Sequence, residues 1–186
     1  MKKIMFTLAA VACVATMQAA QFEWSMSQVR DGWNTGDNKI GGTAYLFLVS
    51  SSVTEAGVAS AISSATDSTA LDTTLKGMAL DSTALTAGAV GAKQTADGIS
   101  ATAPATLFAV VLSDDGHVYQ LGGTTIDTIE TLGPTTVSFG SQKSATQAAS
   151  AWKTVGGGGT DPLPEPTSGL LLLVGGAMLA LRRKQK

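Results

Sequence analysis

Apolar positions along the chain fall into three kinds of segment. Uninterrupted apolar runs lie near both ends, at residues 4–15 and 170–181. Between them, shorter apolar runs are separated by clusters of Gly, Ser, Thr and Asp, and a long Ala/Ser/Thr-rich stretch covers residues 51–103. The short punctuated runs are typical of strands and turns, whereas the terminal runs are typical of targeting segments.

Five short runs predict strands in the middle of the chain. The runs at 42–49 and 106–112 are dense in aromatic and β-branched residues, which favour strands. Asp114-Asp115-Gly116 then predicts a hairpin turn into 117–121, because Asp-Gly between two apolar runs is a hairpin signal. Residues 135–139 predict a further strand, and 22–26 an edge strand.

The stretch at 51–95 predicts a helical insertion. Ser52 and Glu55 have the spacing of a capping box, as do Ser144 and Gln147 before Trp152. Asp-Ser-Thr-Ala-Leu occurs at 67–71 and again at 81–85. The apolar positions that recur at helical intervals are Val58, Ile62, Ala65, Leu71, Leu75, Met78 and Leu85.

These elements predict a small α+β domain. We expect a mostly antiparallel sheet of four to five strands with the helical insertion covering one face. Large side chains are scarce in the middle of the chain, so its aromatic residues are expected to fill the core. They are Trp24, Trp33, Phe47, Phe108, Phe139 and Trp152.

The N-terminal run predicts a cleaved secretory signal helix over residues 1–20. Lys2 and Lys3 precede the apolar run, and the small residues Ala19 and Ala20 follow it as expected cleavage positions. Cys13, the single cysteine of the chain, lies inside this segment. The exported domain, residues 21–155, is therefore expected to lack disulfides, and signal peptidase and the export machinery are expected partners.

Charge is distributed unevenly along the chain. All fourteen acidic residues but only six of the twelve basic ones lie in residues 21–166. An acidic middle repels phosphate backbones, which disfavours nucleic acid as a partner. The single His and single Cys also exclude a Cys/His zinc site.

The C-terminal segment has four consecutive parts. A Gly/Pro linker at 156–163 is followed by Pro164-Glu165-Pro166, then Thr167 and Ser168. An apolar segment at 168–181 predicts a transmembrane helix. It ends in a basic tail at 182–186, where Arg182, Arg183, Lys184 and Lys186 are expected to stop transfer on the cytoplasmic side.

Residues 164–186 resemble the sorting signal of the PEP-CTERM family in order, spacing and position. The resemblance implies a Gram-negative exported protein that passes through the inner membrane, where an exosortase cuts it near the Pro-Glu-Pro motif. It also implies a final location at the cell surface or outside the cell, with exopolysaccharide or biofilm. A simple C-terminal membrane anchor is the alternative, although fourteen residues reach only about 21 Å as a helix.

Two groups of polar residues merit consideration as sites. Asp31, Asn34 and Asp37 lie on a Gly-containing loop at 31–38 and are weak candidates for calcium, because they lack EF-hand spacing. His117 beside Asp114 and Asp115 has the residue types of a general base with an orienting carboxylate, and Ser113 those of a nucleophile, but neighbours in a tight turn point apart. We therefore expect no catalytic residues, no cofactor and no metal.

The sequence as a whole favours a non-enzymatic, exosortase-processed protein of the cell envelope or extracellular matrix. The main alternative is a carbohydrate- or calcium-dependent surface adhesin that uses the 31–38 loop or the hairpin tip. Binding to native exopolysaccharide distinguishes these two hypotheses.

Overall fold

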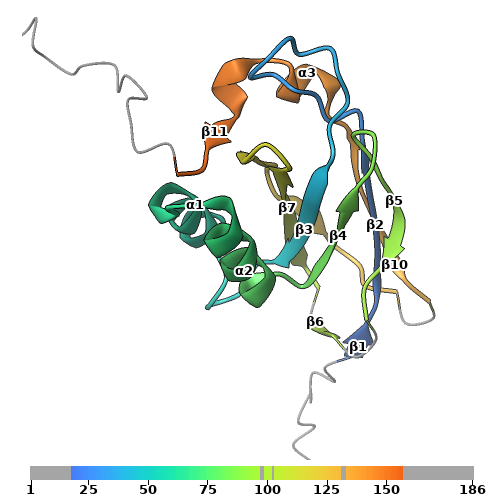
Figure 1. Cartoon of the computed structure of the whole chain (residues 1–186). Helices are drawn as coiled ribbons and strands as arrows, with labels where there is room; N and C mark the ends of the chain where they lie inside the picture. The colour runs from blue at the N-terminus through green and yellow to red at the C-terminus, as the bar shows by residue number, and fades with distance from the viewer. Residues whose placement is uncertain (1–17, 97–98, 102, 131–132, 157–186) are drawn as a thin grey trace, which may run out of the picture. The chain divides into compact units, whose positions relative to one another are not determined.

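The computed structural model describes residues 18–96, 99–101, 103–130 and 133–156 (Figure 1). Most of the predicted signal segment, the Pro-Glu-Pro motif, the 168–181 segment and the basic tail lie outside the described residues. Within the described part, no helix has the length and apolar character needed to cross a membrane.

The described strands form two main sheets and one small pair, so the fold is mostly β with few helices. The expectation of a single sheet of four to five strands was wrong, because the strands divide between two layers that share a core. The larger sheet has the order β11–β8–β7–β3–β4, and β9 also pairs with β7. Its strands are β11 (Lys153–Thr154), β8 (His117–Gln120), β7 (Ala105–Ser113), β3 (Gly42–Leu48), β4 (Asp81–Leu85) and β9 (Thr124–Ile126). The three-stranded sheet has the order β10 (Thr135–Ser141), β2 (Phe22–Ser27), β5 (Val90–Gln94), and β1 (Gln18–Ala20) pairs with β6 (Ile99–Ala101).

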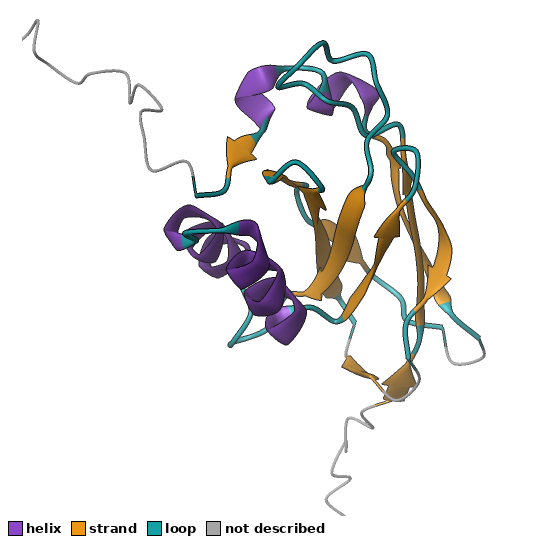
Figure 2. Cartoon of the chain, viewed as in Figure 1, coloured by secondary structure: helices purple, strands orange, loops and turns teal. Residues whose placement is uncertain are grey.

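The β3–β7 pair forms the centre of the molecule. These strands are antiparallel, and Phe47 lies directly opposite Phe108, with the two rings stacked at a centroid distance of 4.8 Å. Helices cover one face of the pair and the three-stranded sheet covers the other (Figure 2). The strand predicted at 106–112 is confirmed as part of β7. Both of its faces are buried, which agrees with its nearly continuous apolar sequence.

Helices α1 (Glu55–Ser64) and α2 (Ser68–Met78) confirm the first part of the helical insertion. They bury Val58, Ile62, Leu71 and Leu75 against the sheet. The cap expected at Ser52 was wrong. Thr54 caps α1, because its side chain accepts the Gly57 N–H, three residues along.

The second part of the insertion, residues 81–94, was expected to be helical and instead forms β4 and β5. The copy of Asp-Ser-Thr-Ala-Leu at 67–71 caps and begins α2, while the copy at 81–85 is β4. β4 pairs along the whole of its length with β3, and Leu85 is buried in the core. Pairing with β3 therefore overrides the local helical pattern.

Two further expectations differ from the structure. The 22–26 run was expected at a sheet edge, but β2 lies between β10 and β5 and pairs in parallel with β10. The capping box expected at Ser144 is absent, because Ser144 lies inside α3 (Lys143–Thr146) and the helix has no side-chain cap. A short 3₁₀ turn, η1 (Ala149–Ala151), then leads to Trp152.

The predicted hairpin is confirmed. β7 and β8 are antiparallel, and Gly116 has a φ of 78° in the intervening turn. At the other end of the fold, β1 is the described partner of β6, and the cleavage expected after Ala20 would remove it. The mature domain would then depend on the two main sheets and the helices.

Candidate functional site

The 31–38 loop and the β7–β8 hairpin, which the sequence singled out separately, meet at one end of the fold. Trp33 of the loop stacks on His117 at the start of β8, with ring centroids 4.2 Å apart and planes inclined by 4°. Trp152 meets Trp33 edge-on at 4.7 Å, and Tyr119 lies 5.6 Å from Trp152. We call Trp33, His117, Tyr119 and Trp152 the aromatic end cluster.

Asp31 organises the 31–38 loop from inside. Asp31 is 5% exposed, and its carboxylate accepts the Asn38 backbone N–H at 3.0 Å, the Asn38 amide at 3.0 Å and the Asn34 amide at 3.3 Å. Burial by itself raises the pKa of Asp31, but these hydrogen bonds outweigh it and lower the pKa below its ordinary value. Because N–H donors already occupy both oxygens, the carboxylate is poorly arranged for a cation.

The other two calcium candidates do not complete a site around Asp31. Asn34 donates its amide to Asp31, and Asp37 is exposed, with its backbone carbonyl accepting a short hydrogen bond from Arg30. Across the part of the chain that the structure describes, no three His, Cys, Asp or Glu residues gather in a group able to hold a metal ion.

The segment at 146–155 is fixed beneath the loop. Trp152 Nε1 donates to the Thr146 carbonyl at 2.9 Å, and the Arg30 backbone N–H donates to Thr146 Oγ1 at 2.9 Å. A Cβ on Gly32 would lie 2.3 Å from the Thr146 carbonyl oxygen, so only glycine allows this approach. Trp152, which directly precedes the last described strand, β11, is therefore held against Trp33 of the 31–38 loop.

His117 is held in a way that does not suit catalysis. The Ser113 hydroxyl accepts the backbone N–H of His117 at 2.9 Å, and one imidazole face is covered by Trp33. The imidazole Nδ1 is buried and has no hydrogen-bond partner among the described residues. Burial lowers the pKa of His117, although the Asp115 carboxylate raises it in part. Ser113, His117 and the turn aspartates do not form a nucleophile–base pair.

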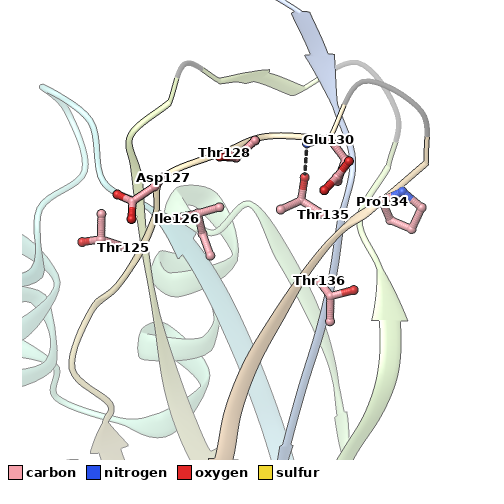
Figure 3. A pocket seen from close by; sticks show the side chains of 8 residues that line it. All are labelled: Thr125, Ile126, Asp127, Thr128, Glu130, Pro134, Thr135 and Thr136. Carbon is pink, nitrogen blue, oxygen red and sulfur yellow. Dashed lines mark hydrogen bonds between the residues drawn. The ribbon is translucent and has the colours of Figure 1, made fainter.

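A second feature, which the sequence reasoning missed, is an open hollow beside β9 and β10 (Figure 3). It has a volume of about 630 Å³. Threonines and carboxylates dominate its lining, which comprises Thr125, Ile126, Asp127, Thr128, Glu130, Pro134, Thr135 and Thr136. The signal in the sequence was the density of Thr and acid at 124–136, but no motif spacing distinguished it from an ordinary loop.

The hollow and the aromatic end cluster lie at opposite ends of β2. Thr135, the first residue of β10, pairs with Phe22 at the start of β2, whereas the 31–38 loop follows its end. Comparison of the chain with protein-family models, with curated proteins and with solved structures found no match in any of the three.

Proposed function

We propose that the chain is an exported, exosortase-processed protein of the cell envelope or extracellular matrix, and that its folded domain is non-enzymatic. The observation that carries this proposal is the PEP-CTERM-like tail, with Pro164-Glu165-Pro166 before an apolar segment and a basic end. The N-terminal signal pattern over residues 1–20 agrees with it, because both ends then serve export.

The organisation of the fold is compatible with a removable tail. The boundary between two units of the chain falls between Val155 and Gly156, at the start of the glycine run. Just before it, the Val155 N–H donates to the Gly116 carbonyl at 2.9 Å, and β11 pairs with β8. Eight residues separate Val155 from Pro164. Cleavage near the motif therefore leaves the described fold and its closing contacts intact.

A non-enzymatic role fits the way in which potential catalytic groups are used. The hydroxyl of Ser113 accepts a hydrogen bond from the His117 backbone N–H, and the imidazole of His117 stacks on Trp33. In this proposal, the exported domain is a structural or binding component at the cell surface, in contact with exopolysaccharide. A simple membrane anchor and a surface adhesin stay as the alternatives.

Mass spectrometry of the protein from the producing bacterium tests the proposal. We expect the mature chain to lack the peptides that follow the Pro-Glu-Pro motif. Replacing Pro164, Glu165 and Pro166 together by alanine should leave those peptides in place, whereas Pro162→Ala, just outside the motif, should be processed normally. An intact C-terminus in the wild-type protein would overturn processing and leave the simple anchor.

A further inference from the structure

The hollow beside β9 and β10 has the size of a site for a small ligand. Its volume of about 630 Å³ lies within the roughly 300–1,000 Å³ usual for such sites. Two segments build it: β9 with the residues after it, and Pro134 with the start of β10. In Figure 3, Asp127 lies on the β9 side beside Thr125, and Glu130 lies on the β10 side beside Thr135.

One wall of the hollow is fixed by two hydrogen bonds of Thr135. Thr135 is 5% exposed, and its hydroxyl accepts the Glu130 backbone N–H at 2.8 Å. The backbone N–H of Thr135 donates to the Gln21 carbonyl at 2.8 Å, which ties this wall to the residue before β2. On the other side, the hydroxyls of Thr125 and Thr106 lie 3.3 Å apart. Thr125, Thr135 and Thr136 therefore lie on paired strands, whereas Asp127, Thr128 and Glu130 lie in the connection between β9 and β10.

The lining has a definite chemical preference. Threonine hydroxyls both donate and accept hydrogen bonds, and a carboxylate can accept hydrogen bonds from two neighbouring hydroxyls or amines. Asp127 and Glu130 are both exposed, while the half-buried Ile126 and Pro134 offer small apolar surfaces to a sugar ring. The described lining contains neither Lys nor Arg, so anions meet two negative charges without compensation.

We propose that this hollow binds short stretches of a hydroxyl-rich glycan built from neutral or amino sugars, and that it rejects glycans of uronic acids. Asp127 and Glu130 accept hydrogen bonds from sugar hydroxyls or amines, and Thr128 and Thr136 add further polar contacts. This inference rests on the proposed function only for the location where the protein meets the glycan, the cell envelope or extracellular matrix. Binding itself requires neither the tail nor its processing.

Titration calorimetry on the full chain, purified in detergent, tests this inference with three probes: a glucose trimer, a glucosamine trimer and a galacturonic acid trimer. We expect one or both of the first two to bind and the third not to bind. The double variant Asp127→Asn/Glu130→Gln should weaken binding at least tenfold. The matched control, Asp37→Asn/Asp115→Asn, removes two exposed carboxylates at the other end of the fold, away from the hollow, and should bind as the wild type does.

Three results would overturn the inference: failure of both uncharged and amino-sugar trimers to bind, equal binding by the hollow variant, or preferred binding of the galacturonic acid trimer. Since the side chains of Asp127 and Glu130 are exposed, the double variant is expected to fold, and its melting temperature checks this. A correctly processed protein that fails to bind refutes the glycan site alone. Retention of the C-terminal peptides in the protein from the producing bacterium refutes only the sorting proposal, whether or not the trimers bind.

Discussion

Trp24 of β2 and Asp81 of β4 are joined by a hydrogen bond of 2.9 Å from the indole Nε1 to the carboxylate Oδ2, although they belong to different sheets. The Trp24 side chain is fully buried, and this bond satisfies the polar atom of its ring. The contact explains why a polar residue that favours helix caps is accommodated at the first position of a strand.

Replacing Asp81 by leucine should lower the free energy of unfolding by about 1–3 kcal/mol, because the buried indole N–H is left without an acceptor. Asp81→Asn is the matched control, since its amide oxygen still accepts the bond, and it should lose less. Urea unfolding followed by tryptophan fluorescence measures both. Equal losses in the two variants would show that the hydrogen bond itself contributes little.

Gly42 and Gly77 should respond in opposite directions to alanine. Gly42 has a φ of 146°, and a Cβ there would lie 2.2 Å from the Leu112 carbonyl oxygen of the neighbouring strand. Gly42→Ala should therefore destabilise the protein by roughly 2–4 kcal/mol. Gly77, near the end of α2, has open space around it, and Gly77→Ala should stabilise by up to about 1 kcal/mol. Thermal unfolding compares the pair, and a harmless Gly42→Ala would contradict the register of β3 and β7.

The elements that the sequence predicted well are those whose own residues determine them. The run at 106–112 is apolar on both faces, and Asp114-Asp115-Gly116 contains the glycine that its turn requires. The two Asp-Ser-Thr-Ala-Leu segments show the limit, because identical residues begin α2 at 67–71 and form β4 at 81–85. The difference comes from β3, a partner that is remote in the chain.

The sites were predictable only in part for the same reason. The sequence singled out the 31–38 loop and the hairpin tip, but no pattern in it indicated that Trp33 stacks on His117. The hollow was missed because the Thr and acidic residues at 124–136 have no motif spacing, and only the pairing of β9 with β7 and of β10 with β2 fixes the two strands that flank it.

Calcium should leave the stability of the 31–38 loop unchanged. N–H donors from Asn34 and Asn38 already occupy the Asp31 carboxylate, so we expect no shift in melting temperature with millimolar calcium. Asp31→Ala should lower the free energy of unfolding by about 2–3 kcal/mol, because it removes three hydrogen bonds to a charged group. A calcium-dependent rise in melting temperature that Asp31→Asn abolishes would restore the calcium site.

His117 should make the stability of the protein depend on pH. It is the single histidine of the chain, and burial against Trp33 lowers its pKa in the folded state. An unfolded histidine has a pKa of about 6.5, so below that pH the unfolded chain binds a proton that the folded chain does not. Its contribution to stability is therefore full above about pH 6.5 and is lost as the pH falls toward and through the lower folded pKa.

The variant His117→Phe separates this effect from packing. Phenylalanine keeps an aromatic ring against Trp33 but has no proton to gain, so the decline in unfolding free energy between about pH 7 and 5 should become shallower than in the wild type. The lowered pKa values of Asp31 and Asp72 act at more acidic pH, where carboxylates whose folded pKa is lowered become protonated and their contribution is lost. Chemical denaturation at a series of pH values measures the two slopes. Identical slopes would contradict the prediction, because they would mean that folding does not lower the pKa of His117.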